Sequence, residues 1–204
     1  MKKPSKKAGL LKFSLKWGAC VVAVVAATFL VQLILGLFFA NARVAGESMA
    51  ETLRPGDRLV VSRNAQVRRF AIVTFASPED PGHEYIKRVI GLPGDTVMVR
   101  KDVLYINGKR VAEPFLKAAF VRRAVALEAA QKGTVGSGPA FTSSFSLPTL
   151  KATAAQRVPT GHYFVLGDNR PVSYDSRRFG FIKQSAVVGV VKWRYWPLNR
   201  QTLF

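Results

Sequence analysis

The chain has 204 residues, of which 49% are hydrophobic, and its 31 Lys and Arg residues against 12 Asp and Glu give a formal net charge of +19. This apolar fraction is too high for a disordered chain, and the length suits a single globular core. One Cys and two His exclude an internal disulfide framework and a metal cage built from several thiolates. We therefore expect no metal and no cofactor.

Residues 1–17 form a basic tail with no acidic residue; its lysines are Lys2, Lys3, Lys6, Lys7, Lys12 and Lys16. Residues 18–40 follow with one polar side chain, Gln32. As a helix rising about 1.5 Å per residue, this segment is long enough to cross a hydrocarbon core of roughly 30 Å. We predict a single transmembrane anchor, with the lysine-flanked N-terminus in the cytoplasm.

A cleaved secretory signal is the main alternative to this anchor. Ala40-Asn41-Ala42 has the small residues at which such signals are cut. However, the apolar region of a cleavable signal has about 7–15 residues, and this one is longer. A buried helix of a soluble core would leave the flanking lysines unexplained. An uncleaved anchor places residues 43–204 outside the cytoplasm.

Residues 43–204 consist mostly of short segments rich in Val, Ile and aromatic residues, separated by Gly, Pro, Asp and Asn. Such segments are typical of β-strands. We predict strands at residues 58–62, 72–75, 96–100, 163–166 and 186–193. The pair Asn107-Gly108 between apolar residues predicts a hairpin over 104–111. The fold class is therefore mainly β, as an antiparallel sandwich or barrel-like domain.

One segment departs from this strand pattern. Residues 115–131 are rich in Ala and lack Gly and Pro, and their apolar residues at helical spacing are Leu116, Phe120, Ala124 and Leu127. Pro114 and Gly133 suit the start and the end of a helix. The residues that follow, up to 153, are rich in Gly, Ser and Thr. We interpret 112–157 as an insertion that contains a short helix and then a loop or weak hairpin.

The exported part remains basic, with 25 Lys and Arg against 12 acidic residues. Nucleic-acid binding requires this charge to be organised on a recognisable motif, and the sequence contains none. A basic face near anionic lipid headgroups is the interpretation that we favour. We expect a lipid bilayer with anionic lipids as a partner, and no nucleic acid.

Two residues of the exported part are candidates for catalysis. Ser48 lies a few residues after the anchor, and Lys87 lies in the apolar run 85–90. In a strand, Lys87 shares a face with Tyr85 and Val89, and burial on that face would lower its pKa. Taken alone, a serine of this kind is usually a turn residue, and a strand lysine usually faces solvent.

The order of three motifs behind the anchor resembles the bacterial type I signal peptidase family. The motifs are Ser48-Met49…Thr52-Leu53…Gly56-Asp57, Tyr85-Ile86-Lys87-Arg88…Gly91-Leu92-Pro93-Gly94-Asp95, and Gly167-Asp168-Asn169-Arg170…Ser173…Asp175-Ser176-Arg177…Gly180. The resemblance covers the anchor and nearly all of 43–193; the insertion 112–157 lies outside it.

This resemblance implies a membrane-anchored serine endopeptidase that removes N-terminal signal peptides from exported preproteins after small residues, in the pattern Ala-x-Ala. It implies a single-pass protein of the bacterial cytoplasmic membrane with a periplasmic or extracytoplasmic peptidase domain at 43–204. Ser48 matches the nucleophile and Lys87 the general base of a Ser/Lys dyad.

Other positions match supporting roles in the same family. Ser173 matches the hydroxyl that holds the lysine, and Asp175 and Arg177 match an ion pair of that region. The turn beneath them corresponds to Gly167, Asp168 and Asn169. Shallow apolar pockets that admit small substrate side chains correspond to Met49, Tyr85 and Ile86.

The sequence departs from the family pattern at several positions. Gly46 stands where some members have a hydroxyl that donates to the oxyanion, so the second oxyanion donor is left open. Glu51 stands where the family usually has Pro, and its carboxylate would favour protonated Lys87 unless Arg54 or Arg58 neutralises it. The departures Pro171-Val172 and Arg69-Phe70-Ala71 also indicate a specialised member.

Three functional alternatives therefore stay open beside a general signal peptidase. The first is a dedicated processing peptidase for one exported substrate, such as a pilin or a conjugation protein. The second is a membrane-anchored binding protein with a catalytically dead peptidase fold, which intact Ser48 and Lys87 argue against. The third is a DNA-binding membrane protein, which only the charge supports.

Overall fold

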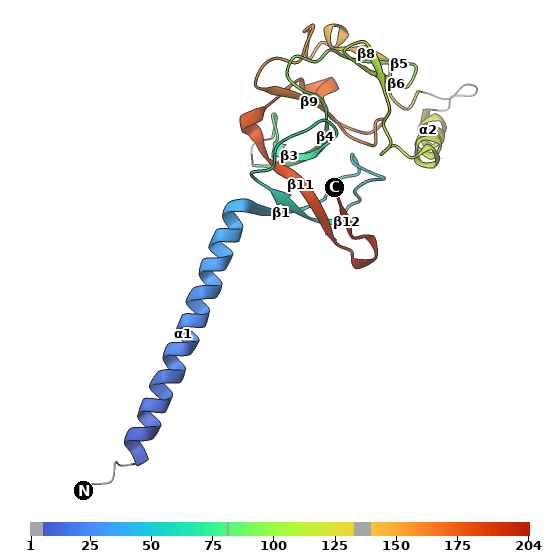
Figure 1. The fold of residues 1–204 in the computed structure, drawn as a ribbon. Helices are drawn as coiled ribbons and strands as arrows, with labels where there is room; N and C mark the ends of the chain where they lie inside the picture. Colours follow the sequence, from blue (N-terminus) through green and yellow to red (C-terminus); the bar gives the residue numbers. More distant parts are fainter. Residues whose placement is uncertain (1–5, 81, 133–139) are drawn as a thin grey trace. The chain divides into compact units, whose positions relative to one another are not determined.

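A computed structural model describes the backbone of residues 6–80, 82–132 and 140–204 and divides the chain into two compact units, residues 1–39 and 40–204 (Figure 1). The first unit is helix α1 (Lys6–Phe38). Its segment Trp17–Phe38 is long and apolar enough to cross a membrane, and none of it is buried inside the protein. Residues 1–5 of the predicted basic tail lie outside the described residues.

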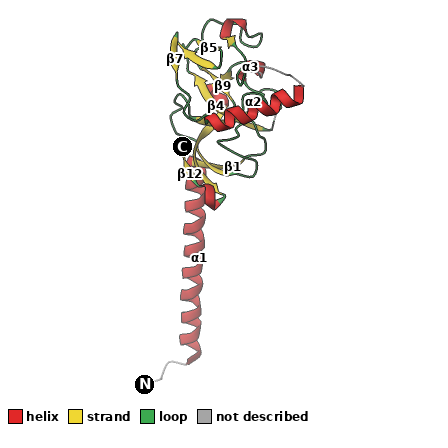
Figure 2. Ribbon diagram, turned by 90° about the vertical axis from the view of Figure 1, so that its right-hand side faces the viewer, coloured by secondary structure: helices red, strands yellow, loops and turns green. Residues whose placement is uncertain are grey.

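The second unit is built on antiparallel sheets, which confirms the mainly β fold class (Figure 2). The larger sheet has the order β1-β2-β11-β3-β4-β9-β10, with β12 paired to β11. Its strands are β1 (Phe39–Arg43), β2 (Arg58–Ser62), β3 (Ile72–Ala76), β4 (Glu84–Gly91), β9 (His162–Leu166), β10 (Ile182–Lys183), β11 (Val187–Trp196) and β12 (Thr202–Leu203).

The smaller sheet has the order β7-β6-β5-β8. Its strands are β5 (Val97–Arg100), β6 (Val103–Ile106), β7 (Lys109–Val111) and β8 (Phe145–Ser146). The predicted hairpin is confirmed, because β6 and β7 pair antiparallel around Asn107 and Gly108, which have φ values of 52° and 75°. Two consecutive residues with positive φ are the signature of the tight turn that Asn-Gly favours.

Strand β1 contains the small-residue tripeptide Ala40-Asn41-Ala42 and pairs with β2. Ala40 and Ala42 pack against a buried cluster that includes Met49, Leu53 and Val61. Alternate residues of a strand point to the same face, which explains why the two alanines face the core together. The tripeptide is therefore part of the sheet of the second unit.

The insertion contains helix α2 (Ala118–Lys132) and the short helix η1 (Leu147–Thr149). Later in the described chain come the short helices α3 (Ser176–Phe179), η2 (Gln184–Ala186) and η3 (Leu198–Arg200). Helix α2 begins later than the predicted residue 115, because a turn from Glu113 to Leu116 precedes it. Phe120 packs on Phe141, whereas Leu127 stays 59% exposed. The predicted apolar face is thus only partly covered. Residues 133–139 of the insertion lie outside the described residues.

Candidate active site

The candidate nucleophile and base lie in direct contact, although 39 residues separate them in sequence. Ser48 lies in the turn that follows β1, and the neighbouring Met49 and Leu53 hold this turn to the core. Lys87 lies in β4 and is 5% exposed, and its Nζ donates to Ser48 Oγ at 2.6 Å. The same Nζ lies 5.4 Å from the centre of the Tyr85 ring.

The surroundings of Lys87 change its acidity. Burial lowers the pKa of Lys87 to about 8, and the carboxylates of Asp175 and Asp168 oppose this effect. Desolvation dominates because the ammonium form loses most of its water inside the protein. A large fraction of Lys87 is therefore neutral near pH 8 and able to accept a proton.

Arg54 neutralises Glu51, which is the exception that the sequence analysis allowed for. Its carboxylate pairs with Arg54 at 2.7 Å and with Arg123 of helix α2 at 3.1 Å. The charges that raise the pKa of Lys87 come instead from Asp175 and Asp168. Arg54 was one of the two arginines expected to pair with Glu51. The other ion-pair partner is Arg123 of the insertion, and not Arg58.

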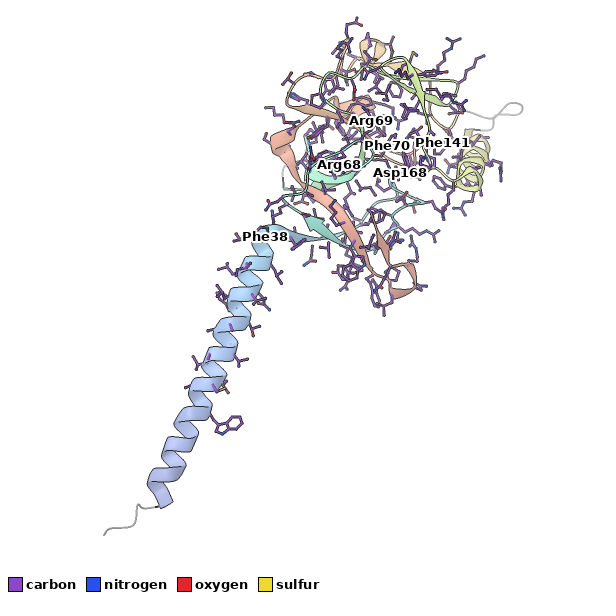
Figure 3. All side chains as sticks on the ribbon, in the orientation of Figure 1. Phe38, Arg68, Arg69, Phe70, Phe141 and Asp168 are labelled. Carbon is purple, nitrogen blue, oxygen red and sulfur yellow. The ribbon has the colours of Figure 1, made fainter. Side chains whose placement is uncertain are left out.

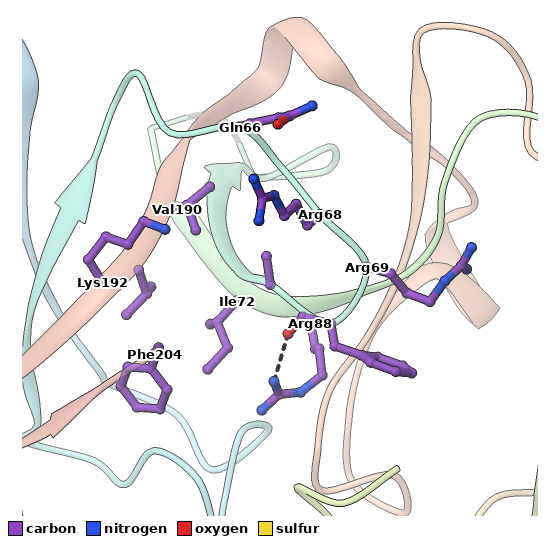
Figure 4. Close-up of a pocket in the computed structure, with 11 residues that line it drawn as sticks. Gln66, Arg68, Arg69, Ile72, Arg88, Val190, Lys192 and Phe204 are labelled. Carbon is purple, nitrogen blue, oxygen red and sulfur yellow. Dashed lines mark hydrogen bonds between the residues drawn. The ribbon is translucent and has the colours of Figure 1, made fainter. Parts of the chain in front are cut away.

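Asp168 connects the strand of the base to the turn of the nucleophile. Asp168 is labelled in Figure 3. Both its oxygens accept from Arg88, at 2.8 and 2.6 Å, and Thr52 Oγ1 donates to it at 2.6 Å. Arg88 also donates to the Phe70 carbonyl at 2.8 Å (Figure 4) and lies 3.9 Å from the Phe115 ring centre. This buried ion pair has its hydrogen bonds satisfied, so its residues hold a fixed geometry.

The turn 167–169 contacts the main chain of the nucleophile directly. The backbone N–H of Asn169 donates to the Ser48 carbonyl at 3.0 Å, and its side-chain amide donates to the Glu47 carbonyl at 3.2 Å. A Cβ at Gly167 would overlap both the Ser48 carbonyl oxygen and the Ser173 hydroxyl. Glycine is therefore required here for the close approach of two chain segments.

Asp175 and Arg177 form an ion pair at 2.8 Å. Asp175 also accepts from the Gly167 N–H at 3.1 Å and caps α3 by accepting from the Arg177 N–H. Ser173 is 6% exposed, and no described group forms a hydrogen bond with its Oγ. No hydrogen bond joins Ser173 to Lys87 among the described residues.

Three residues of the motifs have contacts that the sequence analysis did not assign. Thr52 and Arg88 hold Asp168, and Arg170 is fully buried against Glu113 and Thr142 of the insertion. The position of Arg88 inside an apolar strand could have indicated that it forms a buried ion pair, since a buried arginine almost always requires a carboxylate partner. The partner itself lies 80 residues away.

A cavity of about 550 Å³ opens onto the dyad. Residues 43–49 and 83–87, among them Tyr85 and Ile86, line it together with Asp80, Val172 and Tyr174. Met49 also lines it but is 1% exposed, so this side chain belongs mainly to the core beneath the cavity. Another cavity, of about 460 Å³ and lined by Arg68, Arg69 and Arg88, contains neither dyad residue (Figure 4).

One edge of strand β4 is open where it borders the cavity of the dyad. Residues 84–88 pair with β3 on one side, whereas pairing with β9 on the other side begins only at Arg88. Within the described part of the chain, no strand pairs with that second edge of residues 84–87. An unpaired edge beside a nucleophile offers hydrogen-bonding groups to an extended peptide.

Comparison with known proteins shows the family to which this chain belongs. The family model described as "Signal peptidase, peptidase S26" matches residues 16–196. Signal peptidase I of Bacillus caldolyticus is 42% identical over 166 residues, which cover 79% of this chain and 82% of the relative. Signal peptidase I of Streptococcus pneumoniae is 38% identical over 175 residues, which cover 80% of this chain and 85% of the relative.

The solved structures agree with the sequence comparison. A crystal structure of a signal peptidase I from Enterococcus faecalis is 46% identical and superposes with a TM-score of 0.51, covering 62% of this chain and 97% of that one. Together with the family match over most of the chain, this likeness settles the relationship. The chain belongs to the signal peptidase family S26.

Proposed function

We propose that this protein is a Ser/Lys-dyad endopeptidase that removes signal peptides from exported preproteins after small residues. The observation that carries the proposal is the 2.6 Å contact between Ser48 and the buried Lys87, at the floor of an open cavity. The relatives named signal peptidase I support the substrate class. A geometry of this kind suits acyl transfer, because the base already touches the hydroxyl that it must deprotonate.

In this mechanism neutral Lys87 takes the proton of Ser48 as Oγ attacks the scissile carbonyl. The protonated amine then gives this proton to the leaving nitrogen, and a water activated by Lys87 hydrolyses the acyl-enzyme. The N–H of Ser48 donates to the oxyanion. We assign to Ser173 the role of a hydrogen-bond partner for Lys87, supported by its buried hydroxyl that has no partner among the described residues.

The other supporting residues position the segments that carry Ser48, Lys87 and Ser173. Asn169 holds the turn of Ser48, and Asp168 joins that turn to Arg88 beside the base. Asp175 and Arg177 hold the segment that carries Ser173. We infer that these residues keep Ser48 and Lys87 in hydrogen-bonding contact and do not themselves contact the substrate.

Substrate recognition is proposed to use the open edge of β4. An extended signal-peptide segment would add to this edge, and its successive side chains would then point alternately to the Tyr85 face and the Ile86 face of β4. Small side chains fit a shallow pocket beside such large neighbours, which supports cleavage in the pattern Ala-x-Ala.

We propose that α1 is a single-pass anchor with its N-terminus in the cytoplasm and that residues 43–204 form the extracytoplasmic peptidase domain. The lysine-rich flank supports this orientation. Anionic lipid is the proposed second partner. Trp193 and Trp196 of β11 are 39% and 47% exposed, and aromatic side chains of this kind favour the membrane interface.

The test is cleavage of a panel of exported preproteins in detergent, with cut sites mapped by mass spectrometry. Ser48→Ala should abolish cleavage, and Ser185→Ala, which changes an exposed serine outside the motifs, should not. A Ser48→Ala rate above about a hundredth of the wild-type rate would contradict the dyad, because loss of a catalytic nucleophile typically costs far more. Cleavage of a single preprotein would favour the dedicated peptidase, and no cleavage by the wild type would favour the binding protein.

A further inference from the structure

A groove of about 690 Å³ lies between the turn of the nucleophile and the insertion helix α2. Glu47 and Ala50 line it on the side of the turn, and Ala124 and Leu127 line it on the side of the helix. Leu127 is 59% exposed although it continues the apolar face of α2. Among the described residues, nothing packs over this part of the helix closely enough to bury it.

Charged contacts fix α2 as a wall of this groove. Glu51, two residues beyond Met49, accepts from Arg123 of α2 at 3.1 Å. At the base of the insertion, Glu113 pairs with the fully buried Arg170, which follows the turn that contacts Ser48. The helix is therefore tied to both segments that position the nucleophile, and a ligand in the groove would lie next to the dyad.

The groove borders the cavity of the dyad. Glu47 and Val172 line both spaces, and Val172 is 62% exposed between them. A peptide whose residues before the cut fill the dyad cavity must pass Ser48 and continue on the other side. The groove begins at that point, so the path of the chain after the cut leads into it.

We propose that the first residues on the mature side of the cleavage site bind in this groove, and that helix α2 sets a specificity for them. The occupant is an extended peptide segment of the preprotein itself. Ala124 and Leu127 offer it an apolar wall, and Arg54 and Glu128 form a rim of mixed charge. This inference rests on the proposed function, because it requires the scissile bond to lie at Ser48.

The test introduces a charge on the groove wall and measures how well the variant enzymes cleave substrates of opposite charge. Leu127→Glu and Leu127→Lys are compared on two preproteins that differ only in having Lys or Glu at the second and third residues after the cut. The measured quantity is the ratio of kcat/KM for the Lys substrate to kcat/KM for the Glu substrate. Relative to the wild type, this ratio should rise about 2- to 5-fold in Leu127→Glu and fall by a similar factor in Leu127→Lys, as expected for exposed charge pairs.

Two controls separate this effect from general changes. Leu198→Glu and Leu198→Lys alter another leucine that is 67% exposed and lines neither space, and their ratios should stay at the wild-type value. For a substrate pair that differs instead at the second residue before the cut, the ratio of kcat/KM values should be the same in the Leu127 variants and the wild type.

The outcomes decide the two proposals separately. The proposed role of the groove is overturned if the wild type cleaves both preproteins but the ratio of kcat/KM values differs less than about 2-fold between the two Leu127 variants. It is also overturned if this ratio differs equally between the two Leu198 variants. If the wild type cleaves neither preprotein, or Ser48→Ala cleaves both, the proposed function itself is wrong.

Discussion

The pH dependence of cleavage follows from the burial of Lys87. Its pKa falls from an ordinary 10.5 to about 8, which corresponds to about 3 kcal/mol of differential solvation. At pH 7 this change raises the neutral fraction from about 0.03% to about 9%, a gain of roughly 300-fold. We therefore expect kcat/KM to rise about tenfold from pH 6 to 7 and about fivefold from pH 7 to 8, and to level off above pH 9.

Stability should change over a different pH range. The folded state disfavours the charged form of Lys87, so the unfolded state binds more protons between about pH 8 and 10.5. This group therefore makes the free energy of unfolding rise with pH across that window, and its cost is constant below it. Below about pH 7, activity should keep falling without a further loss of stability from this lysine.

The assay is the kcat/KM profile from pH 5.5 to 10 on one preprotein, with thermal unfolding measured in the same buffers. Lys87→Arg should be inactive throughout, because guanidinium does not lose its proton. Asp175→Asn should move the acidic limb to lower pH, since the Asp175 carboxylate raises the pKa of Lys87. A limb centred near pH 10, or an active Lys87→Arg variant, would refute the role of Lys87 as the base.

Three further predictions concern neighbouring residues. Gly46→Ser should raise kcat several-fold if the new hydroxyl donates a hydrogen bond to the oxyanion. A side chain fits at this position, because a Cβ at Gly46 would meet only open space. Gly46→Ala is the control, and equal kcat values for the two variants would contradict this reasoning. Glu51→Gln should change kcat/KM on an Ala-x-Ala preprotein less than about 2-fold and lower stability by at most about 1 kcal/mol, since Glu51 makes only exposed pairs; a larger loss of stability in denaturant unfolding would show a role that these pairs do not explain. Asp168→Asn should cost about 3–5 kcal/mol in the same unfolding assay, because it leaves Arg88 buried without a carboxylate; a cost below about 1 kcal/mol would show that Arg88 finds another partner.

Much of the fold could be predicted because its signals are local. The anchor, the strands and the Asn107-Gly108 hairpin each depend on a short run of residue types, and backbone preferences act over the same range. The later start of α2 and the incorporation of Ala40 and Ala42 into the sheet depended on neighbours that a local pattern does not contain.

The site, like the fold, has some features that the sequence predicts and others that only the tertiary structure decides. The order of the motifs was enough to predict Ser48 and Lys87 as a pair, and their roles remain predictions until cleavage is measured. The burial that lowers the pKa of Lys87, the Asp168–Arg88 pair and the Glu51–Arg123 contact each join segments far apart in sequence. Only the tertiary structure decides these contacts, because desolvation and ion pairing depend on which distant segments pack together.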